Sequence, residues 1–340
     1  MQTLSTQRMG AVRGTIRAGS TVNNADNCNI NALADVVAAR ARLSALNRAF
    51  SGGGNSSLKF LIGVDGSEGS DVAFTVTLQE LMRSRDSLHV LHAFDSTKKK
   101  SDLPESMKPG PLKEAVDNRL MALLAKRRYF LNWTDKKGEN TVPYLTSYVN
   151  KLAREDAIAR RTFFVAGYNG RKKGNSLAIN SAGKFCLPSI IVKQPVMPAN
   201  AENKPAPRIF VACVKDPSNA GATAQCYDIA LELMKPGQGD QLVVLHVYDE
   251  SFNGDEVDAK LTKWAGHFAQ RFAEDGIVSS GSKFLPIAHP SGTPPRDVIV
   301  TQLAALAANY VVLVPTLEKV DVTMKHVLVH AECNLVVCKR

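Results

Sequence analysis

The sequence predicts an α/β protein made of two tandem copies of an open, five-stranded parallel sheet flanked by helices. Short apolar runs typical of buried strands alternate with segments of helical periodicity, which is the pattern of a parallel sheet covered on both faces. The alternation stops at a proline-rich stretch and then restarts, so that LHVLHAFD at 88–95 is answered by LVVLHVYD at 242–249. The 340 residues, 44% of them hydrophobic, are enough for two such domains.

Each element of the first copy is predicted from its own pattern. Strands are short runs of Val, Ile, Leu and Phe, and helices are longer segments with apolar residues every three to four positions. In chain order, the predicted elements are a strand at 59–64, a helix at 71–83, a strand at 87–94, a helix at 113–128, a strand at 129–133, a helix at 144–160, a strand at 162–166, a short helix, and a strand at 189–193.

The second copy repeats this order. Its first helix carries LELM at 231–234, which answers LQELM at 78–82 in the first copy. The third strand of this copy is not assigned to residues. In chain order, the predicted elements are a strand at 208–214, the helix with the LELM run, a strand at 242–249, a helix at 255–275, a helix at 297–309, a strand at 310–314 and a strand at 335–337.

These patterns divide the chain into four segments. They are a basic N-terminal arm with an amphipathic helix and a Gly/Ser linker at 1–57, a first domain at 58–195, a Pro-rich linker at 196–205, and a second, degenerate domain at 206–340. We expect the two domains to form an internal pseudo-dimer through their last strands. Both last strands, at 190–192 and 335–337, are apolar, and an apolar edge needs cover.

The arm differs from the rest of the chain in its charge. Residues 1–57 carry six arginines against two acids, which gives a net charge of about +4. An amphipathic helix is predicted to begin after Asn29, and SGGGNSS at 51–57 reads as a flexible linker. Three interpretations stay open: a helix that packs on its own domain, an arm that docks on an acidic protein partner, and an organelle presequence such as a mitochondrial one.

Charge and composition narrow the classes of function. The net charge of +10 is spread over short basic runs without interleaved aromatic residues, so we expect no specific nucleic-acid binding. The sequence has no run of eighteen apolar residues and no apolar secretory signal, so we expect no membrane association. Six cysteines without a CxxC pair fit a reducing compartment, and we expect a cytoplasmic protein.

The residues that follow the strands of the first copy are the candidates for ligand binding. In an open parallel sheet, ligands bind beyond the carboxyl ends of the strands. Here these residues are VDGS at 64–67, Ala93, and AGYNG at 166–170. A glycine-bearing loop that runs into a helix presents backbone N–H groups to an anion, which predicts a phosphate site with Arg171, Lys172 and Lys173 beside it.

Four short motifs, in order and partly repeated, carry a resemblance. They are VDGS at 64–67 after the first strand, LHA at 91–93 in the second, the frame of Gly167, Gly170 and, nine residues later, Asn180-Ser181, and HAECNLVV at 330–337 at the end. Together they resemble the universal stress protein family, in a tandem form with an N-terminal extension. The resemblance covers roughly 58–195 and 206–340. Asn180 departs from the family frame, which has glycine at that position.

The resemblance implies an adenine nucleotide, ATP or ADP, in the first copy. It places Asp65 on the ribose and Val64 and Ala93 beside the adenine. It places the phosphates on Gly167, Gly170 and Ser181, and Asn180 completes the cofactor-binding frame. Asn is the residue other than glycine that best tolerates a left-handed backbone, so this site can survive the change at Asn180.

The second copy lacks the phosphate frame. Pro315 and Glu318 stand where the glycine loop is expected, and proline removes an N–H group while glutamate repels phosphate. Asp216 keeps the position that answers Asp65, although a turn-forming Asp-Pro pair explains it without a ligand. We therefore expect the second copy to be a structural half.

The sequence offers little for catalysis. It has neither a GxSxG elbow nor a Walker lysine motif. His326, His330 and Cys333 have the spacing of one helical face, but no further pair of metal ligands accompanies them, so we expect no metal of the protein's own. His89, His92 and His246 lie in strand patterns, where packing or hydrogen bonding is the simpler role.

Two functions remain. The first is a non-enzymatic universal stress protein that binds an adenine nucleotide in its first domain only, without rapid turnover. The second is a structural protein that has lost its ligand and docks through the arm into a large eukaryotic assembly, such as a cytoskeletal or ciliary one.

Overall fold

The computed structural model describes most of the chain from residue 57 onward. The described ranges are 57–97, 104–124, 129–155, 161–168, 177–195, 206–214, 217, 219–252, 254–277, 281–315 and 321–339. The arm up to residue 56 and the linker at 196–205 lie outside the described residues, so the predicted arm helix and its docking role remain predictions.

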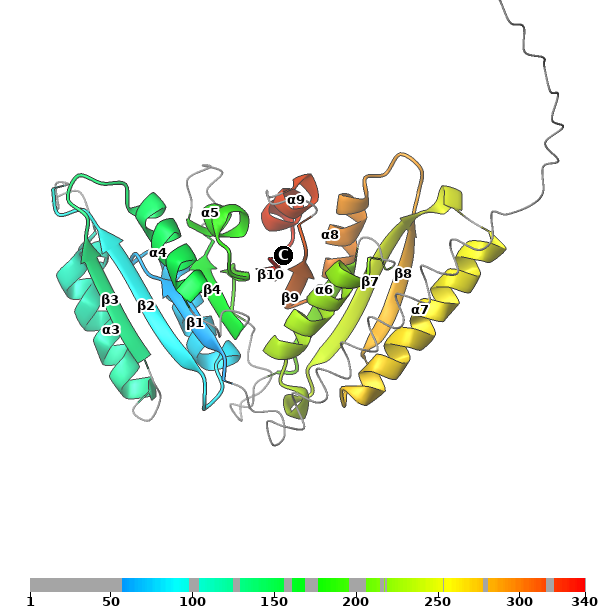
Figure 1. Cartoon of the computed structure of the whole chain (residues 1–340), viewed down its shortest axis with the longest axis horizontal. Coiled ribbons are helices and arrows are strands. Elements are labelled where there is room, and N and C mark those ends of the chain that lie inside the picture. Colours follow the sequence, from blue (N-terminus) through cyan, green and yellow to red (C-terminus); the bar gives the residue numbers. More distant parts are fainter. Residues whose placement is uncertain are drawn as a thin grey trace, which may run out of the picture.

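Ten strands form one sheet in the order β3-β2-β1-β4-β5-β10-β9-β6-β7-β8, and Figure 1 shows it running through the whole molecule. All neighbours within each half pair in parallel. The strands are β1 (Lys59–Gly63), β2 (Ser87–Phe94), β3 (Tyr129–Asp135), β4 (Thr162–Gly167), β5 (Ser189–Val192), β6 (Ile209–Val214), β7 (Gln241–Asp249), β8 (Lys283–His289), β9 (Tyr310–Leu313) and β10 (Asn334–Val337). This arrangement confirms the predicted fold class.

The helices cover both faces of the sheet. They are α2 (Glu68–Val76), α3 (Pro109–Leu124), α4 (Thr141–Glu155), α5 (Leu177–Lys184), α6 (Ala220–Leu233), α7 (Asp255–Glu274), α8 (Pro295–Ala305) and α9 (Val322–His330). One apolar core lies under α2, α3, α6 and α7, and a second lies under α4, α5, α8 and α9. Alternate residues of each central strand feed the two cores, as Phe163 and Phe164 of β4 do, because successive side chains of a strand point to opposite faces.

The two halves meet at β5 and β10, which pair antiparallel. Leu335 lies opposite Ile191, and Val336 lies opposite Ile190. All four side chains are fully buried. The predicted contact between the two apolar last strands is therefore present, and it leaves β3 and β8 as the two edges of the sheet.

Several elements differ in their bounds from the sequence analysis, among them β8, α3 and the first helix. The strand left unassigned in the second copy is β8, whose interior holds Pro286; proline cannot donate to a neighbouring strand, and β8 tolerates it because it is an edge strand. Helix α3 begins at Pro109 instead of 113, because proline is well tolerated in the first turn of a helix. The first helix ends earlier than 83 and closes in a π-helical turn, Thr77–Leu81.

The π-helical turn contacts the second half. The carbonyl of Glu80 accepts a hydrogen bond from the guanidinium of Arg208 at 2.9 Å, and its carboxylate accepts one from the hydroxyl of Tyr310 at 3.0 Å. Single π-helical turns are frequent at functional sites. Here the turn contacts the other half of the same chain.

Two basic side chains cross between the halves in opposite directions at this end of the sheet. The guanidinium of Arg83 donates to the carbonyls of Glu232 and Met234, at 2.6 and 2.7 Å. The ammonium of Lys235 donates to the carbonyl of Met82 at 3.3 Å. Each cation therefore binds carbonyls at the end of the other half's first helix, where the helix dipole favours positive charge.

Candidate functional site

The site predicted for the first copy starts where β1 ends. The N–H of Val64 donates to the carbonyl of Leu91 in β2 at 2.9 Å, which extends the pairing by one residue. The ring of His92 lies 2.7 Å, Nδ1 to oxygen, from the carbonyl of Val64. Since a carbonyl only accepts, Nδ1 carries the proton. His92 is 6% exposed and serves as a hydrogen-bonded core residue, as the sequence analysis expects.

Asp65 and Ser67 build the turn into α2. The Asp65 Oδ1 accepts hydrogen bonds from the Ser67 N–H at 2.9 Å and from the Ser67 hydroxyl at 2.6 Å. The Ser67 hydroxyl oxygen in turn accepts from the N–H of Ser70 at 3.3 Å and caps the helix. Asp65 is exposed, and within the described part of the chain no donor contacts its Oδ2. One carboxylate oxygen thus holds the turn and the other is available to a ligand.

Two glycines let backbones approach closely around this turn. Gly66 has a φ of +77°, and a Cβ there would lie 2.3 Å from the carbonyl oxygen of Ser106. Gly167, at the end of β4, lies so close to the first turn of α2 that a Cβ would sit 1.9 Å from the carbonyl oxygen of Gly69. Gly167 is therefore required for packing β4 against α2.

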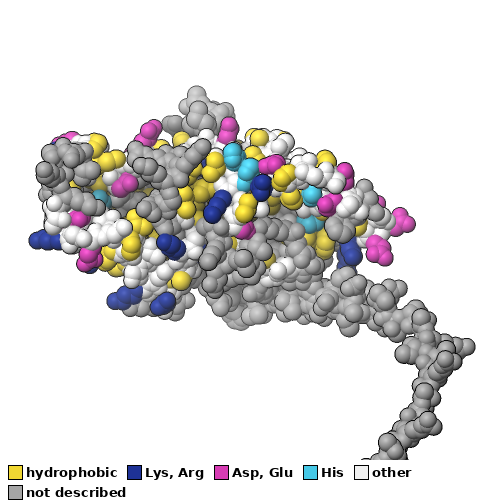
Figure 2. All heavy atoms as spheres, turned by 90° about the horizontal axis from the view of Figure 1, so that it is seen from above, with side chains coloured by type: hydrophobic (Ala, Val, Ile, Leu, Met, Phe, Trp, Pro, Cys, Tyr) yellow, Lys and Arg dark blue, Asp and Glu magenta, His cyan; other side chains and the backbone are white. Residues whose placement is uncertain are grey.

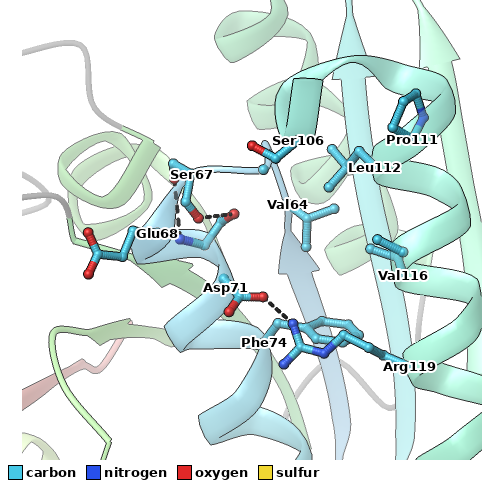
Figure 3. Close-up of a pocket in the computed structure, with 13 residues that line it drawn as sticks. Val64, Ser67, Glu68, Asp71, Phe74, Ser106, Pro111, Leu112, Val116 and Arg119 are labelled. Carbon is cyan, nitrogen blue, oxygen red and sulfur yellow. Dashed lines mark hydrogen bonds and ion pairs between the residues drawn. The ribbon is translucent and has the colours of Figure 1, made fainter. Parts of the chain in front are cut away.

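A cavity of about 200 Å³ opens beside Val64 between α2 and α3. Figure 3 shows that Phe74 of α2 and Leu112 and Val116 of α3 form its apolar wall. At its rim Arg119 of α3 forms an ion pair with Asp71 and donates to the hydroxyl of Thr75 at 2.7 Å, so α2 and α3 are tied together across the cavity. The sequence analysis missed these α3 residues, although the spacing of Leu112, Val116 and Arg119 marks one helical face.

The structure brings four of the seven predicted site residues together. Val64, Asp65, Ala93 and Gly167 lie at the carboxyl ends of β1, β2 and β4, which are neighbours in the sheet. Gly170 and the basic run at 171–173 lie outside the described residues. Asn180 and Ser181 lie in α5, but their side chains are not described. The ligand role of all seven remains a prediction.

Comparison with solved structures places this architecture. A universal stress protein from Archaeoglobus fulgidus DSM 4304 matches over 84% of this chain and 100% of its own length, with 16% identity and a TM-score of 0.57. The chain has the universal stress protein fold. A functionally unknown protein from Pseudomonas aeruginosa PAO1 matches over 84% of this chain and 93% of its own, with 12% identity and a TM-score of 0.51.

A smaller match covers only part of the chain. A universal stress protein family protein from Arabidopsis thaliana, described with AMP bound, matches 39% of this chain and 92% of its own length, with 16% identity and a TM-score of 0.29. No protein-family model and no curated protein matches the sequence.

The second copy of the universal stress protein fold repeats part of the site. His246 lies 3.0 Å, Nδ1 to oxygen, from the carbonyl of Val214, as His92 does from Val64. The strand β9 is followed by Val314 and Pro315, both buried. Asp216 and Glu318 lie outside the described residues, so the predicted loss of a phosphate site rests here on the proline, which has no N–H to offer.

The candidate metal ligands His326, His330 and Cys333 differ in their surroundings. The rings of His326 and His330 are tilted by 35° with centroids 4.3 Å apart, and His326 Nε2 contacts Asp297 at 2.9 Å, whereas Cys333 is buried. In the described ranges no group of three His, Cys, Asp or Glu side chains could hold a metal ion.

None of the helices described has the length and apolar character to cross a membrane. Seen from above, the described part of the surface mixes basic, acidic and apolar side chains, and no large patch of one charge is visible on it (Figure 2).

His92 makes the stability of this site depend on pH. Burial lowers the pKa of His92 below its usual 6.5. Below pH 6.5 the unfolded chain binds a proton at His92 more readily than the folded chain does. The folded protein is therefore most stable above pH 6.5 with respect to His92, and it loses stability as the pH falls below that value. Asparagine at this position can donate to Val64 but does not titrate. We expect the wild type to lose more stability than His92→Asn between pH 7.5 and 5 in urea unfolding, and equal losses would show that His92 does not carry the effect.

Proposed function

We propose that this protein binds one adenine nucleotide, ATP or ADP, across the carboxyl ends of β1, β2 and β4, and that it does so without rapid turnover. The observation that carries the proposal is the available Oδ2 of Asp65, held in the open by a turn that uses only Oδ1. A carboxylate oxygen in this position suits the hydroxyls of a ribose, which are hydrogen-bond donors.

The place of Asp65 in the sheet supports the same proposal. The strand order β3-β2-β1-β4-β5 reverses between β1 and β4, and ligands of open α/β sheets bind at such a point. Asp65 follows β1, and Gly167 ends β4. From there the chain leads to α5, whose N-terminal end is electrostatically favourable for phosphate.

The second half takes no nucleotide in this proposal. Pro315 occupies the position after β9 that an N–H donor would need. The second half instead completes the sheet through β10.

The alternative function is an interaction protein that docks through residues 1–57 into a cytoplasmic assembly, with a cytoskeletal or ciliary assembly as its partner. The close approach of the Ser106 carbonyl to Gly66 favours this alternative, because the segment around Ser106 then lies over the turn that a nucleotide would approach. Nucleotide absorbance released from the purified, denatured full chain supports the first function. Its absence, together with loss of partner binding when 1–50 are deleted, supports the alternative.

Asp65 variants test the nucleotide site. Asp65→Ala removes both oxygens and is expected to weaken ATP binding by about ten- to a hundredfold, the value of one charge-assisted hydrogen bond. Asp65→Asn keeps an Oδ1 for Ser67 and replaces Oδ2 by an amide, so it is expected to lose nearly as much affinity with the turn intact. Asp216→Ala is the matched control in the second copy. Calorimetry that finds equal affinity in all three variants and the wild type would remove Asp65 from the site.

A further inference from the structure

Two lysines bridge the halves in a reciprocal way beside the β5–β10 pairing. Lys193 follows β5 and donates to the carbonyls of Val327, at 3.3 Å, and of Ala331, at the end of α9. Lys339 follows β10 and donates to the carbonyl of Ala182, near the end of α5. Each lysine therefore caps the last helix of the other half, and α5 and α9 pack against the same apolar core (Figure 1).

The two caps differ in what their helices carry. Helix α5 lies between β4 and β5 and holds Asn180 and Ser181, directly before the residue that Lys339 contacts. Helix α9 lies in the second copy, where Pro315 follows β9. From this difference we propose that Lys339, a residue of the second half, is a positioning residue for the nucleotide site of the first half, because it fixes the end of α5. The proposal rests on the proposed function.

Helix α5 depends on such a contact because it is short. It has eight residues, and helices of this length are marginal on their own. Its last carbonyls have no partner within the helix and require donors from elsewhere. Asn150 of α4 supplies one donor, from its side-chain amide to the carbonyl of Lys184 at 3.1 Å. Lys339 supplies another, and its positive charge also opposes the negative end of the helix dipole.

Lys339 is itself held in place by the second half. Its carbonyl accepts a hydrogen bond from the side chain of Gln225 in α6, and the N–H of the preceding Cys338 donates to Leu313 of β9 at 2.8 Å. Lys193 and Lys339 are both partly buried, and this burial lowers the pKa of each ammonium group to about 8. A side chain anchored in this way transmits the position of the second half to α5.

The symmetry provides the control for the experiment. Lys339→Met and Lys193→Met each remove one cap while keeping an apolar chain of similar length, and Lys339→Arg restores a cation. The full-length variants are compared by calorimetry with ATP, by thermal unfolding without nucleotide, and by hydrogen exchange of the amides at 177–184.

Lys339→Met is expected to weaken ATP binding by about five- to tenfold, the effect of one charge-assisted contact at a helix end, and to speed exchange in α5. Lys193→Met is expected to leave ATP affinity and exchange in α5 within twofold of the wild type. The two Met variants are expected to lower the melting temperature by similar amounts. Lys339→Arg is expected to recover most of the ATP affinity. Equal ATP affinity in wild type and Lys339→Met, or equal losses in the two Met variants, would overturn the inference. Absence of ATP binding in the wild type would overturn the proposed function instead, and exchange at 177–184 would then decide alone whether Lys339 orders α5.

Discussion

Asp240→Asn is expected to lower the free energy of unfolding by about 3–5 kcal/mol, because it leaves a buried guanidinium without its counter-charge. Arg208 and Asp240 are 3% and 1% exposed. The Asp240 carboxylate accepts from Arg208 Nε at 3.2 and 3.1 Å, and the two side chains form an ion pair through Arg208 Nη2. Arg208 also donates to Leu233 at 3.1 Å, so the loss reaches α6.

Asp86 is the matched control, because it holds the same place in the first half without an arginine clamp. It accepts from the backbone N–H groups of Leu58 and Arg83, both at 2.7 Å, as Asp240 does from those of Arg208 and Lys235 at 2.9 and 2.7 Å. Asp86→Asn disturbs these backbone bonds and the weaker attraction to Arg83 and Lys235 without breaking an ion pair, and it is expected to cost about 1–2 kcal/mol. Urea unfolding of both variants measures the difference. Equal costs would show that the Arg208 pair adds nothing to the backbone bonds.

Gly167→Ala is expected to destabilise the first half by roughly 2–4 kcal/mol and to abolish nucleotide binding. The added Cβ would lie 1.9 Å from the carbonyl oxygen of Gly69 and 2.7 Å from the N–H nitrogen of Ser70, so the first turn of α2 has to move. This turn is capped by Ser67, which is bonded to Asp65, and a displacement there misplaces the proposed ribose contact of Asp65.

Gly266→Ala provides the comparison for Gly167→Ala. Gly266 lies inside α7, and a Cβ there meets nothing within 4 Å. Alanine is the better helix former, so this variant is expected to be neutral or to gain roughly 0.5–1 kcal/mol. Thermal unfolding and calorimetry with ATP distinguish the two variants. An unchanged Gly167→Ala protein would mean that β4 and α2 separate without cost.

The fold could be predicted because its strands are short apolar runs in a repeated order. The strand at 87–94 was placed to the residue, and the apolar last strands indicated the pairing of the two halves. The strand β8 could not be assigned because Pro286 breaks its pattern, and only its position at the edge of the sheet makes that proline tolerable.

The site was predictable only in part, because local sequence patterns do not encode how closely elements pack. Residues at the ends of strands can be found from the sequence. In this way Val64, Asp65, Ala93 and Gly167 were predicted to lie at one edge of the sheet. The approach of Gly167 to Gly69, however, depends on how closely β4 and α2 pack, and no local pattern encodes that distance. The caps made by Lys193 and Lys339 likewise join segments that are far apart in the chain.

The central claim, one nucleotide site in the first half of a duplicated fold, is tested most directly by the stoichiometry of binding. The measurement is calorimetric titration of ATP and ADP into the full-length protein after removal of any bound nucleotide, with the Asp65→Asn variant in parallel. We predict one nucleotide per chain and about ten- to a hundredfold weaker binding to Asp65→Asn. Two nucleotides per chain, or none to the wild type, would contradict it.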